Sequence, residues 1–178
     1  MAIYTLNEKF VHELRDLYDA EHQFLEAQQM MVQQATDASL KTNLITHIQQ
    51  TQQHITNLEQ AFKLLGQQAK RQPCDAAKGL VSEGQKSMKE AATVPTILDC
   101  VINGAAGKVE HYEIAGYRGL IAGAELMGQE QVVALLRENL RQEEQTAQLV
   151  EQSEPTLLRK AMQQEGQATP SMGAAART

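Results

Sequence analysis

Apolar residues recur every three or four positions along four long stretches of the chain, the spacing of one face of an α-helix. The first stretch covers about residues 5–35, and Thr5-Leu6-Asn7-Glu8 has the pattern of a capping box at its start. The second covers about residues 40–65 and stops at Gly66, a residue typical of helix C-termini. Because the turn between the two stretches is short, we expect these two helices to lie antiparallel.

The connection after Gly66 interrupts this pattern. A polar, basic segment up to Pro73 precedes a predicted short helix over about residues 75–91. Pro95 then suits the first turn of a third long helix, which we expect to end at Met127, before Gly128.

A fourth long helix is predicted over about residues 129–151, followed by a short fifth helix over 155–164. The tail over 165–178 is poor in bulky apolar residues, so we expect it to be disordered. The prediction is therefore one all-α domain over residues 1–164. Its fold class is an antiparallel four-helix bundle with a long crossover between its second and third helices, the arrangement that includes the ferritin-like folds.

Composition agrees with a helical domain and excludes several functions. Aromatic residues make up 4% of the 178 residues, Trp is absent and the net charge is −6. No block of Lys and Arg suggests a nucleic-acid partner, and no apolar run approaches the ~20 residues that span a bilayer. Cys74 and Cys100 form no closely spaced pair, which argues against a zinc ribbon or an iron–sulfur module. No signal peptide is visible, so we expect a cytoplasmic protein.

Carboxylates interrupt the apolar faces of three of the four long helices. They are Glu21 in the first helix, Glu110 and Glu113 in the third, and Glu143 in the fourth. Each is flanked on its own face by apolar residues and lies near the middle of its helix. A buried carboxylate is very costly unless it is paired, protonated or bound to a metal. Four at one depth predict a site for divalent cations.

The second helix differs from the other three. Its apolar face carries no acid, but His47, Gln50 and His54 share an adjoining face at spacings of three and four. For each histidine alone, partly exposed helix surface is the ordinary interpretation, and nitrogen ligation of a metal is the sharper one.

The segments LRDLYDAEHQ and KVEHYEIAGYRGLIAGAELMG resemble the YciE/YciF-type stress-protein family, which is ferritin-like with a rubrerythrin-like bundle. The resemblance covers most of residues 6–160. It implies a homodimer with a dinuclear iron-type site, and it assigns Glu21, Glu110, Glu113 and Glu143 as ligands. Gln50 stands where such relatives usually have Glu, and Ala147, four residues after Glu143, cannot coordinate a metal.

Two functional hypotheses follow. In the first, the chain is a metal-binding stress-associated protein whose four glutamates hold iron or manganese, with His54, and also Gln50 or His47, completing the ligand set. In the second, it is a non-catalytic dimeric structural or interaction protein with a vestigial metal site, which Gln50 and Ala147 favour. The sequence leaves open whether the protein is an enzyme.

Overall fold

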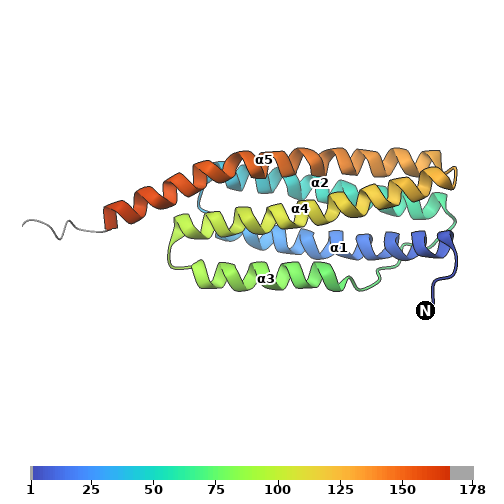
Figure 1. Ribbon diagram of the computed structural model, residues 1–178, viewed down its shortest axis with the longest axis horizontal. Helices are drawn as coiled ribbons and strands as arrows, with labels where there is room; N and C mark the ends of the chain where they lie inside the picture. Colours follow the sequence, from blue (N-terminus) through green and yellow to red (C-terminus); the bar gives the residue numbers. More distant parts are fainter. Residues whose placement is uncertain (1, 169–178) are drawn as a thin grey trace, which may run out of the picture.

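The computed structural model describes residues 2–168, and this part of the chain forms five α-helices and no strand. Figure 1 shows their order along the chain. Their bounds are α1 Leu6–Gln34, α2 Ala38–Leu64, α3 Asp75–Ala91, α4 Pro95–Leu126 and α5 Glu130–Ala168. The all-helical class and the two hairpin turns agree with the prediction from sequence.

The four long helices surround a common interior. Helix α1 packs against α2 and α4, and α5 also packs against α2 and α4, so each long helix has two long neighbours. Helices α1 and α5 run in one direction in Figure 1, and α2 and α4 run in the other. The shorter α3 lies outside this group, against α1 and α4. None of the described helices has a stretch long and apolar enough to cross a membrane.

Local chemistry explains where the helices begin and end. Thr5 and Glu8 form the expected capping box at the start of α1, each side chain bonding the other's backbone N–H. Asp37 caps α2 by accepting hydrogen bonds from the backbone N–H groups of Ser39 and Leu40. Gly66 and Gly128 follow α2 and α4 with φ of 65° and 67°, a region that glycine enters without strain.

A buried carboxylate fixes the turn between α1 and α2 to the start of α4. Asp99 accepts hydrogen bonds from Thr36 N at 2.7 Å, Thr36 Oγ1 at 2.6 Å and Asp37 N at 2.9 Å. We expect Asp99→Ala to lower the free energy of unfolding by about 2 kcal/mol, because it removes the charged acceptor of three partly buried hydrogen bonds. Urea unfolding of the variant measures this loss. A change below about 0.5 kcal/mol, the usual range for surface substitutions, would contradict the assigned role.

The prediction of a separate short fifth helix was wrong, because α5 continues through Pro155. Proline removes one backbone donor and costs about 3 kcal/mol inside a helix. Packing on both sides offsets this cost. Leu157 and Ala161 are buried beyond the proline, and the Ser153 hydroxyl donates to Asn103 Oδ1 of α4 at 2.7 Å. Helix α5 also extends over 165–168, within the predicted tail, whereas residues 169–178 of that tail lie outside the described part of the chain.

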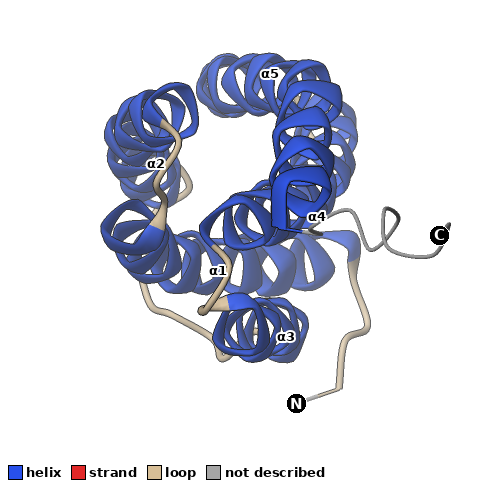
Figure 2. Ribbon diagram, turned by 90° about the vertical axis from the view of Figure 1, so that its left-hand side faces the viewer, coloured by secondary structure: helices blue, strands red, loops and turns tan. Residues whose placement is uncertain are grey.

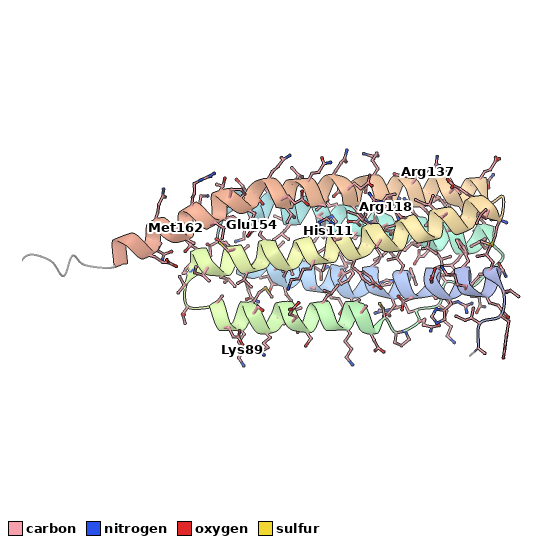
Figure 3. All side chains as sticks on the ribbon, in the orientation of Figure 1. Lys89, His111, Arg118, Arg137, Glu154 and Met162 are labelled. Carbon is pink, nitrogen blue, oxygen red and sulfur yellow. The ribbon has the colours of Figure 1, made fainter. Side chains whose placement is uncertain are left out.

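The interior is divided by a layer of polar residues. One apolar cluster includes Phe10, Phe24, Phe62 and Leu136, and a second includes Met31, Leu40, Leu98 and Ile102. The glutamates and histidines singled out from the sequence lie buried among these apolar residues. Charged side chains such as Lys89, Arg118 and Arg137 project outward from the helices in Figure 3.

Candidate metal centre

Six titratable side chains from α1, α2, α4 and α5 converge in the middle of the interior. All are between 0% and 3% exposed. They are Glu21, His47, His54, Glu110, Glu113 and Glu143. Helical spacing places them there, since Glu110 and Glu113 are three residues apart on α4 and His47 and His54 are seven residues apart on α2.

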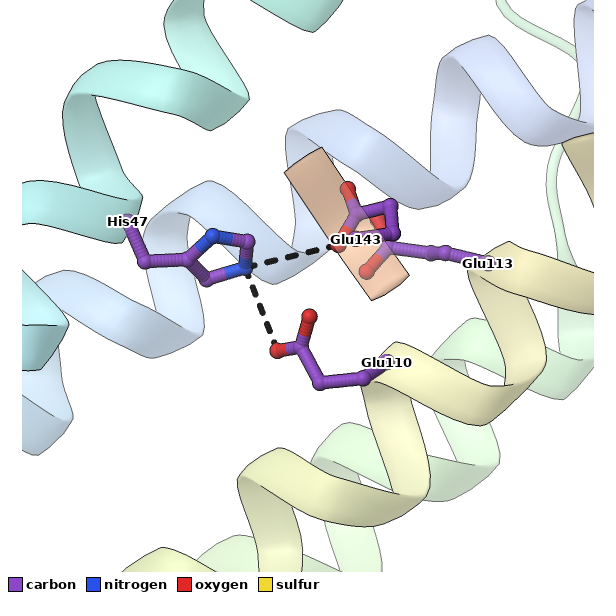
Figure 4. A group of neighbouring side chains, drawn as sticks. All are labelled: His47, Glu110, Glu113 and Glu143. Atoms are coloured by element: carbon purple, nitrogen blue, oxygen red, sulfur yellow. Dashed lines mark ion pairs between the residues drawn. The ribbon is translucent and has the colours of Figure 1, made fainter. Parts of the chain in front are cut away.

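The first of two groups joins His47, Glu110, Glu113 and Glu143. One donor atom from each residue lies within 4.8 Å of every other. His47 Nε2 lies 3.1 Å from Glu110 Oε1 and 3.8 Å from Glu143 Oε2, as the dashed lines in Figure 4 show. Each of these four side chains points toward the same small volume.

The second group joins Glu21, His54 and Glu143, again with donor atoms within 4.8 Å of one another. His54 Nδ1 lies 2.8 Å from Glu143 Oε1 and 3.6 Å from Glu21 Oε1. Glu143 therefore belongs to both groups, and it turns a different oxygen to the histidine of each. This is the arrangement that a carboxylate needs to bridge two cations.

Most of the atoms that point into these groups make no hydrogen bond to a described residue. They are one oxygen each of Glu21 and Glu110, both oxygens of Glu113 and Glu143, His47 Nε2 and His54 Nδ1. Buried polar atoms are normally satisfied, and each one left without a partner costs about 1–3 kcal/mol. Ligand atoms about 2.1 Å from one cation lie roughly 3–4 Å apart, which matches the separations seen here. The donor set therefore fits a metal ion.

Amide side chains fix the orientation of both imidazoles. Gln50 Oε1 lies 3.2 Å from His47 Nδ1, and Gln142 Oε1 lies 2.9 Å from His54 Nε2. An amide oxygen can only accept, so each of these ring nitrogens carries the proton. In the neutral form of each ring, the other nitrogen, His47 Nε2 or His54 Nδ1, turns its lone pair toward the glutamates. Metal-binding histidines are commonly held in this way.

A tyrosine and two asparagines support the second group. The Tyr117 hydroxyl donates to Glu21 Oε1, and Asn139 Nδ2 donates to the Tyr117 oxygen at 3.0 Å and to the His54 carbonyl at 3.2 Å. Asn57 Nδ2 in turn donates to Asn139 Oδ1 at 2.7 Å. This chain of bonds orients one oxygen of Glu21 and leaves its other oxygen without a partner.

Burial changes the proton affinity of the glutamates. Removal from water raises the pKa of Glu110 to about 7 and that of Glu143 to about 8, from an ordinary value of 4.5. Burial and the neighbouring charges of Glu143 and Glu21 raise the pKa of Glu113 well above its usual range. For His54, burial lowers the pKa, but the charges of Glu21 and Glu143 outweigh it and raise the pKa well above 6.5. Without a cation, the cluster therefore retains protons at neutral pH.

The comparison with known protein families assigns the chain to a family. The model of a family described as "Domain of unknown function (DUF892)" matches residues 5–164. The chain belongs to the DUF892 family. The matched range contains all six residues of the candidate metal centre.

One relative, matched both by its sequence and by its solved structure, places the chain more narrowly within DUF892. Protein YciF of Escherichia coli strain K12 is 31% identical over 147 residues, which span 82% of this chain and 88% of YciF. The solved structure of the E. coli stress protein YciF has a TM-score of 0.83 at 29% identity, covering 89% of this chain and 99% of its own. The expected resemblance to the YciE/YciF-type family is confirmed.

A second similar solved structure comes from Rhodopseudomonas palustris. It is named YcfI and described as a candidate structural protein. Its TM-score is 0.81 at 40% identity, and the match covers 84% of this chain and 94% of YcfI. Stress protein and structural protein are thus the two descriptions that these relatives carry.

Of the residues predicted from the sequence of this DUF892 chain, the structure gathers six around one centre and leaves one beside it. Gln50 contacts His47 Nδ1, on the far side of the ring from the glutamates, and accepts a hydrogen bond from Thr146 at 3.3 Å. Asn139, Gln142 and Thr146 of α5 also contact the centre and were not predicted from the sequence. They could have been predicted, since these three polar residues follow one face of α5 at spacings of three and four.

Proposed function

We propose that this protein is a ferritin-like four-helix bundle that binds one or two divalent ions, iron or manganese, in its core. The observation that carries the proposal is the position of Glu143, whose two oxygens face two separate groups of buried donor atoms. The proposed ligands are Glu21, His54 and Glu143 in one group and His47, Glu110, Glu113 and Glu143 in the other. Gln50 is proposed to orient His47, in place of the role as a ligand considered from sequence.

Charge supports two ions as the upper limit. Four glutamates carry four negative charges when ionised, and the two imidazoles add none when they bind as neutral ligands, with the lone pair turned inward by the contacts to Gln50 and Gln142. Two divalent cations would neutralise this set. A mixture of carboxylate and imidazole donors suits iron and manganese, whereas a purely oxygen set would favour magnesium or calcium.

The residues of the chain would hold, orient and shield such ions. Iron or manganese bound there would supply one-electron redox chemistry. The Tyr117 hydroxyl donates a hydrogen bond to Glu21 Oε1. The surrounding apolar clusters exclude bulk water from the centre. A role in stress protection is proposed from the description of YciF as a stress protein.

Elemental analysis of the full chain tests the proposal. Protein purified from cells grown with iron and manganese, and again after reconstitution of the stripped protein, is expected to hold one to two equivalents of one metal. Glu110→Ala should remove that metal and Glu144→Ala should not, because Glu144 lies outside both groups and pairs with Arg118. Less than about a tenth of an equivalent of either metal after reconstitution would contradict the proposal.

A second candidate is a non-catalytic structural or interaction protein with a vestigial site. The description of YcfI favours it, as does the absence of a carboxylate from the buried face of α2. This candidate predicts that the variant lacking all four glutamates behaves like the parent in cells. Both candidates include a cytoplasmic homodimer that binds no nucleic acid.

A further inference from the structure

A cavity of about 570 Å³ lies at the end of the molecule where the chain begins. Its walls come from residues 2–3, the first turns of α1 and the segment 67–73 that connects α2 to α3. In Figure 1 these parts meet at the right-hand end, beside the N-terminus. None of the six residues of the candidate metal centre lines it. Its volume is within the range of small-molecule binding sites, about 300–1,000 Å³.

The segment 67–73 is fastened to α1, so this cavity has defined walls. Gln72 N donates to the Arg15 carbonyl at 3.3 Å, and Arg71 Nε donates to Asp19 Oδ1 at 2.7 Å. At the end of the segment, Cys74 N donates to Asp19 Oδ2 at 2.8 Å. These three hydrogen bonds hold the C-terminal end of the segment against α1.

The cavity is lined by more positive than negative side chains, although the net charge of the whole chain is −6. Arg15, Lys70 and Arg71 line it, against one carboxylate, Glu8. The Glu8 Oε2 atom already accepts from the backbone of Tyr4 and Thr5 in the capping box. Of the three cations, only Arg71 has a carboxylate partner within residues 2–168.

Two of these cations are therefore available to a ligand. The Arg15 Nε atom is buried and makes no hydrogen bond, and the only bond of its guanidinium to a described residue goes from Nη2 to Gln67 Oε1 at 3.3 Å. Lys70 makes no hydrogen bond or ion pair to any residue that the structure describes. A buried guanidinium N–H without an acceptor, such as Arg15 Nε, costs free energy. Carboxylate or phosphate oxygens are the acceptors that satisfy it best.

The remaining lining residues define the rest of the ligand. Ile3, Val11 and Pro73 offer apolar surface. His12 Nε2 lies 2.7 Å from Gln72 Nε2, and since an amide nitrogen can only donate, the imidazole accepts there and carries its proton on Nδ1. The cavity thus combines cationic donors with an apolar wall.

We propose that this cavity binds a small organic anion, with its carboxylate or phosphate group on Arg15 and Lys70 and its apolar part against Ile3 and Val11. The site is separate from the metal centre and does not depend on it. It gives the protein a second ligand-binding function, at the end of the molecule where α1 begins.

Isothermal titration of the full chain with phenyl phosphate and with phenylacetate tests this proposal. We expect saturable binding of at least one of the two at one site per chain, tighter than that of inorganic phosphate or acetate, which lack the apolar part. The ligand that binds more tightly shows whether the site prefers a phosphate or a carboxylate group. Lys70→Gln and Arg15→Gln should each weaken binding by about tenfold, because each removes a charge-assisted hydrogen bond. Affinity should be the same for metal-stripped and metal-reconstituted protein, so this result stands apart from the metal proposal.

Lys89→Gln is the matched control, because it removes the same charge from the exposed end of α3, away from the cavity. If Lys89→Gln weakens binding as much as Lys70→Gln, the attraction is diffuse and the proposed site is wrong. Absence of saturable binding at about 10 mM of both aromatic anions also overturns it. Lys70 is exposed, so its variant is expected to fold even if Arg15→Gln does not, and circular dichroism of each variant verifies this.

Discussion

Replacing Glu143 by glutamine is expected to remove metal from both groups at once. The carboxylate offers Oε1 to the side of His54 and Glu21 and Oε2 to the side of His47 and Glu110. An amide of the same shape keeps the packing but removes the charge and one of the two oxygen donors. Bound iron or manganese after reconstitution should fall from one or two equivalents to less than about a tenth, measured by elemental analysis.

The neighbouring residue provides the control. Glu144 follows Glu143 on α5 but pairs with Arg118 outside the core, at 2.7 Å. Glu144→Gln changes net charge by the same amount and should retain the full metal content. If Glu143→Gln lost only half of the metal, each ion would be held without the bridge, and the shared role of Glu143 would be wrong. The variant should remain folded, because burial raises the pKa of Glu143 to about 8, so glutamine replaces a side chain that is largely neutral at pH 7 without a cation.

The metal-free protein is expected to become less stable as pH rises from about 5.5 to 8.5. The pKa values of Glu110 and Glu143 are raised from 4.5 to about 7 and about 8 in the folded chain. Above pH 4.5 the unfolded chain has released these protons while the folded chain still holds them, so the folded state binds more protons and each rise in pH favours unfolding. The loss is complete above the folded pKa values and amounts to a few kcal/mol, at about 1.4 kcal/mol per pKa unit.

Urea unfolding of chelated protein at the two pH values measures this effect. Glu143→Gln should flatten the dependence, since it removes the group with the higher of the two pKa values, and Glu144→Gln should leave it unchanged. Saturating metal should reverse the trend, because metal binding requires deprotonated ligands and strengthens as pH rises. Greater stability of the metal-free protein at pH 8.5 than at pH 5.5 would show that the core glutamates are ionised without a cation.

The helix ends could be predicted because they are determined by residues that lie close together in the sequence. The capping box of Thr5 and Glu8, Pro95 in the first turn of α4, and Gly66 and Gly128 after α2 and α4 each act within a few residues. The break expected at Pro155 fails for the opposite reason. Contacts of Leu157 and Ser153 with distant parts of the chain keep α5 continuous, and local sequence carries no information about them.

The residues of the candidate metal centre divide in the same way, into those that one helix predicts and those that depend on a neighbouring helix. Glu21, Glu110, Glu113 and Glu143 stand out from sequence because each interrupts an apolar face, which needs knowledge of one helix only. The role of His47 and His54 depends on the face that α2 turns toward α5, where Gln142 bonds His54 and Thr146 lies 3.3 Å from His47 Nδ1. That face is polar on both helices, so apolar periodicity alone placed the histidines beside the core and not in it.

The order of the ligands along the chain has a consequence for synthesis. Glu21 and the two histidines belong to the first hairpin, Glu110 and Glu113 to α4, and Glu143, which both groups share, to the last helix. A chain leaving the ribosome can pair α1 with α2 early, but neither group of donors is complete until α5 has emerged and docked. The proposed ions therefore cannot rescue a truncated chain or nucleate its folding, and they can be acquired only by a finished protein.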